Sequence, residues 1–467
     1  MKHTLPPAAL FILMGNAATA QRQMGISTSR FNAQNSLYLN PANVAGCKEK
    51  FSILLFSTNL AVDNNLGTIS SLGEITSSLN TDTGSTPSLF KYKDKSEFSM
   101  MLPMFEVRLP GLLYRINSRH TLAISTRVRV FNEFNNFSTK LYTTVIDPNT
   151  AAQQATTRIS SKNFNWTAHV WGDIGLTYGA VAIDNEKLQV KAGVTLRYLG
   201  GAGYLGLKGN NLDISYTNGS DSFYAANSDI QFSSNASGAD KAITNGVNFS
   251  DIFAGDNSGR GFGADIGVTV GFNPDGNASN GSNENSNTNY KIVASAAITD
   301  IGALTYSKAS FVKLTGNGYM TGKGISDNVK SYEELRQYAR QNGYSADTGV
   351  ASTKVHLPTA LILGVDYMIV NRLYANITYA GDMTNDRNFG SKLYSQVTIT
   401  PRFDSRVLTI AVPFTYSMLS HSMRAGLGVK FSGFYAGSDD MMALFSNGQY
   451  GFNFYFGVMV PIYRKSK

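Results

Sequence analysis

The chain has 467 residues and a formal net charge of +8, yet only 15% of its residues are charged, against about a quarter in typical soluble domains. Aromatic residues make up 11%, and no stretch after residue 20 approaches the roughly 18 consecutive apolar residues of a membrane helix. This composition excludes helical membrane spans and is typical of an all-β transmembrane barrel, whose strands hide their hydrophobicity in alternation.

Residues 1–20 have the features of a signal peptide. Lys2 supplies a positive start, a short apolar core follows between Ala8 and Met14, and Ala18-Thr19-Ala20 matches a small-x-small cleavage pattern. We therefore predict cleavage after Ala20 and export to the outer membrane of a Gram-negative cell. The alternative is an ordinary disordered N-terminus.

Residues 21–50 are predicted to form a short N-terminal plug or periplasmic segment, and residues 51–467 the barrel. Pro41 has no N–H and fixes its own φ, and it restricts Asn40 to extended conformations. The Asn40-Pro41 pair therefore predicts a rigid turn just before the first strand.

The barrel wall is predicted from apolar residues at every second position, with polar residues between them facing the lumen. Bacterial single-chain barrels have even strand numbers, so we predict about 14 strands, with 12 as the next choice. Thirteen segments show the pattern: 51–60, 98–116, 120–133, 164–182, 187–200, 260–272, 290–304, 355–370, 372–381, 393–403, 405–416, 421–434 and 450–463.

The lengths of the connections predict the orientation of the barrel. Short connections at 117–119, 184–186 and Asn371 indicate periplasmic turns. Long polar stretches indicate extracellular loops, at 61–97, 132–163, 201–259 and 305–353. Within the third of these, segments 201–217 and 222–233 could pair as a hairpin above the membrane.

Two loops have features of their own. Segment Val329–Gly343 is the one predicted helix, because Ser331 and Glu334 form a capping box. The insert from Phe272 to Tyr290 is rich in Asn, Asp and Gly and falls where a periplasmic turn is due. It is interpreted as a floppy loop rather than a calcium site, since it lacks EF-hand spacing.

The parity of the strands also predicts which side chains line the lumen. They could steer an anionic head group or form a structural polar network. Lumen-facing glycines could let another segment approach the wall, or could relieve crowding. The predicted lumen-lining residues are Arg127, Arg129, His169, Asp173, Lys191, Arg197, Asp265, Arg424 and Lys430.

The sequence gives no sign of catalysis or of a cofactor. His169 and Asp173 share the lumen face, but no signature marks a nucleophile for a Ser–His–Asp arrangement. Histidines are too sparse for a metal cluster, and Cys47 is the only cysteine. We therefore predict no enzyme activity, no metal, no cofactor and no nucleic-acid partner.

Several short segments resemble a family of uncharacterised outer-membrane barrels of the Bacteroidota, itself distantly similar to the long-chain fatty-acid (hydrophobic compound) transporter barrels. These segments are "LYLNPANVAG", "LPTALILGVDYMIVNRLYANITYAGD", "GFYAGSDD" and the final "VPIYRK". The resemblance implies a 14-stranded barrel with an Asn-Pro-Ala motif in an internal plug. By that resemblance, Asn40, Pro41 and Ala42 form the plug-to-barrel junction.

The predicted function is a passive transporter or channel for small hydrophobic or amphipathic solutes. The alternative is a non-transport scaffold or surface-interaction protein, acting through its long loops in a secretion or attachment assembly. Expected partners are outer-membrane lipid and lipopolysaccharide, the barrel-assembly machinery and a small hydrophobic ligand.

Overall fold

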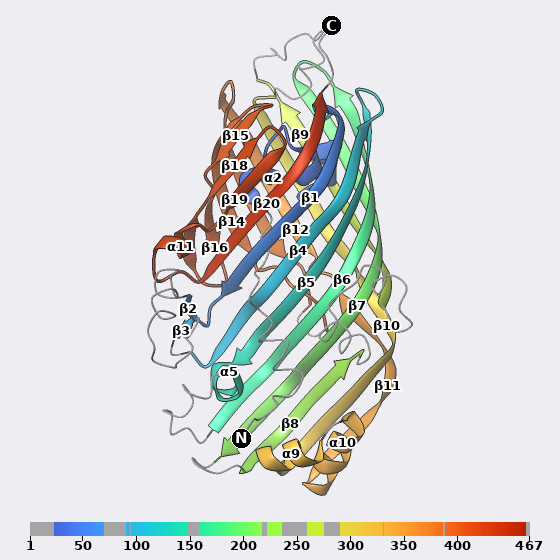
Figure 1. Cartoon of the computed structure of the whole chain (residues 1–467), viewed down its shortest axis with the longest axis vertical. Coiled ribbons are helices and arrows are strands. Elements are labelled where there is room, and N and C mark those ends of the chain that lie inside the picture. The colour runs from blue at the N-terminus through green and yellow to red at the C-terminus, as the bar shows by residue number, and fades with distance from the viewer. Residues whose placement is uncertain are drawn as a thin grey trace.

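A computed structural model describes residues 23–69, 90–93, 95–146, 158–216, 222–235, 259–274, 290–329, 331–385 and 388–463. These residues form one closed barrel of antiparallel strands (Figure 1). The predicted signal peptide and most of the 272–290 insert lie outside the described residues.

The wall is an 18-stranded sheet that closes where β20 pairs with β1. Its strands are β1 (Glu49–Asn64), β4 (Glu97–Arg115), β5 (His120–Ser138), β6 (Arg158–Asp184), β7 (Leu188–Tyr216), β8 (Ser222–Ser234), β9 (Gly259–Phe272), β10 (Ile292–Thr321), β11 (Tyr344–His356), β12 (Ala360–Val370), β13 (Leu373–Asp382), β14 (Gln396–Asp404), β15 (Leu408–Ala411), β16 (Phe414–Ser417), β17 (Ser422–Ala425), β18 (Leu427–Phe431), β19 (Phe434–Ser438) and β20 (Gly451–Tyr463). A separate ribbon pairs β2 (Gly67–Ile69) with β3 (Phe90–Tyr92).

Four places in the wall are each filled by two consecutive strands: β8 with β9, β11 with β12, β15 with β16, and β17 with β18. The barrel therefore has about 14 strand positions, which confirms the predicted number. The position missing from the thirteen predicted segments is β19. It has only five residues and follows β18 after a tight turn, in which Ser432 has a φ of 55°.

The alternation of side chains separates two surfaces. On β7, Leu196 is 63% exposed on the outside, whereas Arg197 is 2% exposed on the inside. Outward-facing Ile266, Leu363 and Val429 extend the same apolar surface around the wall. Because lipid tails cannot hydrogen-bond, a closed barrel with an apolar exterior is the form that a β-protein takes in a bilayer. None of the described helices is long and apolar enough to cross a membrane.

Beyond this apolar surface, one side of the wall continues as a tall extension of β7, β8, β10 and β11 (Figure 1, lower end). The predicted hairpin above the membrane is present, because the end of β7 pairs with β8. The predicted helix is α10 (Tyr332–Gln341), in which the Ser331 hydroxyl accepts a hydrogen bond from the Glu334 N–H at 3.2 Å.

Two expectations about the loops are wrong. Much of 305–353 is strand rather than loop, because the hydrogen-bonded ladder continues where the outward face is no longer apolar. The extracellular loops also hold more than one helix, namely α5 (Thr139–Ile146), α9 (Gly322–Asn328) and α11 (Met442–Phe445) besides α10.

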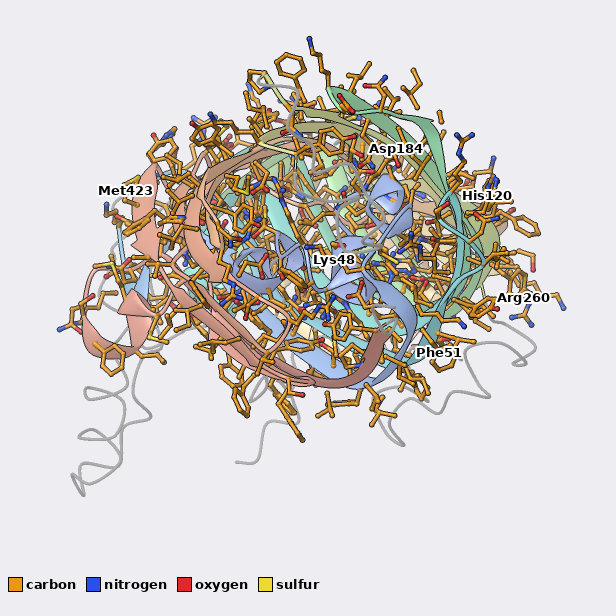
Figure 2. All side chains as sticks on the ribbon, turned by 90° about the horizontal axis from the view of Figure 1, so that it is seen from above. Lys48, Phe51, His120, Asp184, Arg260 and Met423 are labelled. Atoms are coloured by element: carbon orange, nitrogen blue, oxygen red, sulfur yellow. The ribbon has the colours of Figure 1, made fainter. Side chains whose placement is uncertain are left out.

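The N-terminal segment 23–48, called the plug below, lies inside the ring of strands (Figure 2). It contains α2 (Met24–Ser27), α3 (Ala33–Ser36) and the 3-10 helix η1 (Pro41–Val44). It fills the end of the barrel where the turns 117–119 and 371–372 lie, which we call the inner mouth. The opposite end is the outer mouth.

Candidate functional site

The Asn-Pro-Ala motif joins the plug to the wall. The Asn40 side chain accepts a hydrogen bond from the Ala42 N–H at 2.8 Å and so caps η1, which begins at Pro41. Its amide group donates to the carbonyl oxygens of Val268 at 3.0 Å and Ala296 at 3.2 Å. The motif therefore ends a turn of the plug and holds it against β9 and β10 at once.

Lumen-facing glycines let this turn touch the wall. A β-carbon added at Gly193 would lie 2.3 Å from the Pro41 carbonyl carbon, and one at Gly267 would lie 2.0 Å from the Asn40 side-chain oxygen. Gly179 similarly faces the end of η1 at 2.6 Å. Close approach of another segment, rather than relief of crowding in the lumen, therefore explains all three glycines.

A charged cluster occupies the inner wall beside the plug. Arg127 donates to Asp173 at 2.7 Å and to Asp300 at 2.6 Å, and Arg129 donates to Glu106 at 2.8 Å. The cluster pairs four arginines with four carboxylates, all buried: Arg108, Arg127, Arg129 and Arg197 with Glu106, Asp173, Asp265 and Asp300. Its charges are balanced within the wall, which favours the structural-network interpretation over steering of an anionic head group.

Glu106, Arg108 and Asp300 are the members of this cluster that are not among the predicted lumen-lining residues, and Asp300 is the one that alternation places on the wrong face. Ile298 pairs with outward-facing Ile266 and therefore faces outward itself. Strict alternation would place Asp300, two residues later, on the same outward face. A β-bulge between Ile298 and Ile301, with Asp300 at a φ of 56°, turns its carboxylate inward instead. The sequence does contain a sign of this bulge: a charged residue stands at a position that alternation assigns to the lipid face, and a glycine follows two residues later.

Tyr38 connects the plug to the charged cluster. Its ring lies under the guanidinium of Arg108 at 4.0 Å and of Arg127 at 5.3 Å. Such cation–π contacts contribute on the order of 0.5–2 kcal/mol each. The plug thus packs, through Tyr38, against arginines that are held in position by ion pairs with the wall carboxylates.

Wall carboxylates also bind the backbone and side chains of the plug. Asp439 accepts hydrogen bonds from the N–H groups of Met24 at 2.8 Å and Gly25 at 3.0 Å, at the start of α2. Asp366 accepts from the Arg30 guanidinium at 2.8 Å, and Asp404 accepts from the Arg30 N–H at 2.8 Å. The plug is therefore fixed at several separate points around the ring.

The other predicted lumen residues also lie on the inside. His169 contacts the Tyr306 hydroxyl at 3.0 Å and stacks on Trp171. Lys191 lies beside Cys47 and Gly46 of the plug. Arg424 is paired with Asp63, and the Lys430 ammonium donates to the Arg406 carbonyl at 3.1 Å.

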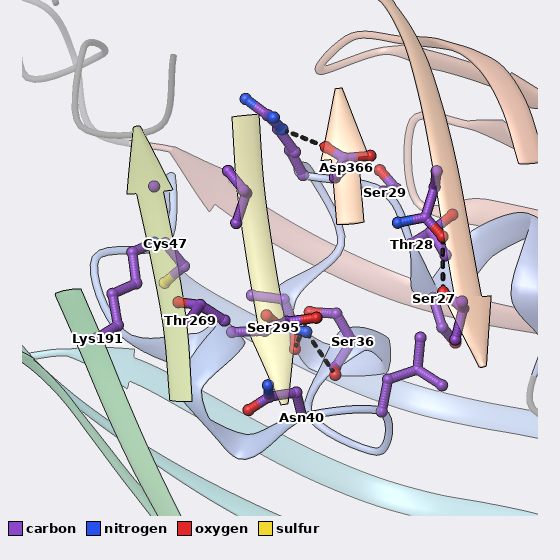
Figure 3. A pocket seen from close by; sticks show the side chains of 18 of the residues that line it. Ser27, Thr28, Ser29, Ser36, Asn40, Cys47, Lys191, Thr269, Ser295 and Asp366 are labelled. Carbon is purple, nitrogen blue, oxygen red and sulfur yellow. Dashed lines mark hydrogen bonds and ion pairs between the residues drawn. The ribbon is translucent and has the colours of Figure 1, made fainter. Parts of the chain in front are cut away.

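A small cavity remains between the plug and the wall (Figure 3). Its volume is about 130 Å³, well below the roughly 300–1,000 Å³ of typical ligand pockets. Its polar lining includes Ser36, Asn40, Thr269, Ser295 and Asp366. Within the described ranges, no group of three or more His, Cys, Asp or Glu side chains is placed to hold a metal ion.

Above the plug, the interior holds an apolar cluster that the sequence did not predict. The first apolar cluster includes Met101, Phe131, Trp171, Leu199, Tyr204 and Tyr306. A second apolar cluster lies on the outward face of the wall, because Phe134 and Trp166 share the parity of outward-facing Leu122 and Ile174. It includes Phe98, Met100, Phe134, Phe164, Trp166 and Leu212. The signal in the sequence is that Phe131, Trp171 and Leu199 have lumen parity in strands whose other inward residues are polar.

A second chain segment enters the lumen from the outer side. In residues 388–395 between β13 and β14, called the inner loop below, Phe389 is 4% exposed and packs in the first apolar cluster. Its carbonyl accepts from the His356 N–H at 2.9 Å, and the Lys392 N–H donates to the buried Glu133 carboxylate at 2.6 Å. The interior is therefore filled by the plug, by the inner loop and by wall side chains.

The chain belongs to the family described as "Family of unknown function (DUF5723)", which matches residues 41–439. No curated protein sequence matches the chain. Solved structures similar to it include the TodX deltaS2S3 mutant monoaromatic hydrocarbon channel, with 10% identity, a TM-score of 0.43 and 96% of each chain covered.

Two further similar structures are the Ralstonia pickettii toluene transporter TbuX and a Pseudomonas aeruginosa FadL homologue. TbuX has 10% identity and a TM-score of 0.39, with 92% of this chain and 94% of that chain covered. The FadL homologue has 10% identity and a TM-score of 0.32, with 96% of this chain and 99% of that chain covered. The predicted resemblance is confirmed, and at this identity it concerns the fold alone.

Proposed function

We propose that the protein is an outer-membrane channel that passively admits small hydrophobic or amphipathic solutes. The observation that carries this proposal is the apolar cluster inside the barrel. A barrel that conducts ions or sugars keeps a polar, water-filled lumen, whereas here an apolar cluster that includes Phe131, Trp171 and Tyr306 packs inside the wall. An apolar solute loses no hydrogen bonds on entering such a lining and gains from leaving water.

The plug and the inner loop have to move for a solute to pass. Both are held by hydrogen bonds, ion pairs and packing, each of modest net strength at about 0.5–1.5 kcal/mol for a hydrogen bond. Asn40, Tyr38 and Asp439 supply such contacts for the plug, and Glu133 supplies one for the inner loop. These contacts can break and re-form without disturbing the closed wall.

Localisation and partners form part of the same proposal. The exposed apolar face would contact outer-membrane lipid and lipopolysaccharide, the barrel-assembly machinery would insert the chain, and the inner mouth would face the periplasm. Residues 1–20 would direct export and be removed after Ala20.

Proteoliposomes test the proposal directly. We expect a small aromatic hydrocarbon to equilibrate faster with protein-containing vesicles than with empty ones, while a disaccharide of similar size does not. Deletion of residues 21–46 should raise uptake further and allow ion current in planar bilayers. Absence of both solute uptake and current, with no change on deletion, contradicts the channel.

The alternative function is a scaffold or surface-interaction protein. The tall extension of β7, β8, β10 and β11 with α10 favours it, because this part rises beyond the apolar exterior and is not needed to enclose a lumen. Affinity purification from membranes distinguishes the two functions: a stoichiometric protein partner that is lost on removal of the α10 hairpin supports the scaffold.

A further inference from the structure

A second, larger pocket opens at the inner mouth, between the end of the plug and two wall turns. Its volume is about 460 Å³. It is lined by Phe31 and Lys48 of the plug, by the β12–β13 turn at Arg372 and by the β14–β15 turn at Arg406, with Asp404 at its side. Three separate elements of the chain thus each bring one cation to the same space.

The charges of this pocket do not balance. Three basic residues line it against one carboxylate, that of Asp404. Asp404 is already engaged, because it accepts from the Ser29 hydroxyl at 2.7 Å, the Thr409 hydroxyl at 2.8 Å and the Arg30 N–H at 2.8 Å. The pocket therefore differs from the charged cluster around Tyr38, where arginines and carboxylates are equal in number.

Lys48 lies in a half-buried environment that is partly aromatic and partly cationic. Its ammonium lies 4.1 Å from the centre of the Phe31 ring. Burial, together with the nearby charges of Arg30 and Arg406, lowers the pKa of Lys48 to about 8. Among the residues described, no carboxylate forms an ion pair with Lys48 or with the exposed Arg372.

Arg372 is also held in an uncommon conformation. It has a φ of 70° in a two-residue turn, where glycine or asparagine is favoured. Non-glycine residues in this region cost on the order of 1 kcal/mol or more and occur mostly where the surroundings or a function maintain them. A guanidinium at this position is therefore unexplained by the turn alone.

We propose that this pocket binds a phosphate group, either free in the periplasm or carried by a phospholipid of the inner leaflet. Two arginines and one lysine from three elements line the pocket, and guanidinium and ammonium groups are the usual partners of phosphate oxygens. Because Lys48 is the last residue before β1, the bound anion would also tie the plug to the wall. This proposal does not depend on transport.

The test uses the full-length protein with inorganic phosphate as the probe. We expect phosphate to bind by calorimetry in detergent with a dissociation constant in the millimolar range or below. Lys48→Gln and Arg372→Gln should each weaken binding roughly tenfold, the effect of losing one charge-assisted hydrogen bond. Arg158→Gln is the matched control, since Arg158 is an exposed arginine at the outer end of β6.

A second arm identifies the source of the phosphate. In nanodiscs of anionic phospholipid, the same two variants should bind fewer lipids by native mass spectrometry than Arg158→Gln. Lipid binding without free-phosphate binding assigns the pocket to a lipid head group and supports the proposal. The absence of both, or equal losses in all three variants, overturns it. Heat-modified mobility in gels checks that each variant is folded.

Discussion

Gly193 of β7 lies directly against Pro41 of the plug, so that a β-carbon at Gly193 would meet the Pro41 carbonyl carbon at 2.3 Å. The contact is between backbone and backbone, and no side-chain rotation can relieve it. Gly193 therefore gives the most direct way to displace the plug without removing any of its residues.

We expect Gly193→Val to expel the plug from the inner mouth while the wall still closes. The measurement is limited trypsin digestion of the folded protein: cleavage after Arg30 and Lys48 should become fast. Gly349→Val on β11 is the control, because a β-carbon there meets only the Phe311 ring at 3.3 Å. Equal protection of Arg30 and Lys48 in both variants would show that the plug accommodates the added side chain.

The reactivity of Cys47 shows whether the plug stays inside the barrel in the unmodified protein. This residue is 4% exposed among Leu37, Val44 and Leu113, and burial raises the pKa of its thiol to about 12. Because the thiolate is the reactive form and exists only near or above that pKa, we expect no maleimide labelling of the folded protein at pH 7–8. Labelling should appear on unfolding, and in Gly193→Val.

The positive control for this experiment moves the thiol to the surface. In Cys47→Ala/Ser118→Cys the new cysteine lies in an exposed turn at the inner mouth and should be labelled at once. Rapid labelling of Cys47 in the folded, unmodified protein would mean that the plug does not stay in place.

Alternation was enough to predict much of this fold, because a lipid exterior imposes it on every strand. It placed Arg127, Arg197 and Arg424 on the inside and marked most strand positions. It missed Asp300 because a bulge reverses parity at one residue. It also stopped strands too early, because outside the membrane nothing forces the outward face to be apolar.

The filling of the lumen could not be predicted in the same way. Phe389 belongs to a loop whose sequence looks like an ordinary polar connection, and its burial depends on Gly206 of β7, where a β-carbon would meet the Phe389 ring at 2.5 Å. The Asn-Pro-Ala motif indicated a plug junction, but its partners Gly193 and Gly267 are far away in sequence. Contacts of this kind are set by the tertiary structure.

The exterior of the wall gives a prediction about the membrane. Leu363 of β12 is 41% exposed and faces outward, and an arginine facing lipid near the bilayer midplane costs about 2–4 kcal/mol. Leu363→Arg should therefore block or strongly slow folding into lipid vesicles. Val350→Arg should fold normally, because Val350 is 66% exposed on β11 in the tall extension. Folding is followed by heat-modified gel mobility, and equal yields would contradict the assigned membrane zone.

Asp300 allows the charged cluster to be tested without changing its shape. Asp300→Asn keeps the size of the side chain and its tolerance of positive φ, but removes the negative charge shared by Arg127 and Arg129. Breaking a buried ion pair costs about 3–5 kcal/mol, and we expect the lower end, since Asp173 and Glu106 still pair with these arginines. The urea midpoint of unfolding in vesicles should fall accordingly.

Asp213→Asn is the matched control for this prediction, because Asp213 pairs with the exposed Arg158. An exposed ion pair contributes about 0–1 kcal/mol, so its loss should leave the urea midpoint almost unchanged. If Asp300→Asn and Asp213→Asn unfold at the same urea concentration, the cluster does not stabilise the barrel. The inward turn of Asp300 would then need another reason, such as keeping a charge off the lipid face.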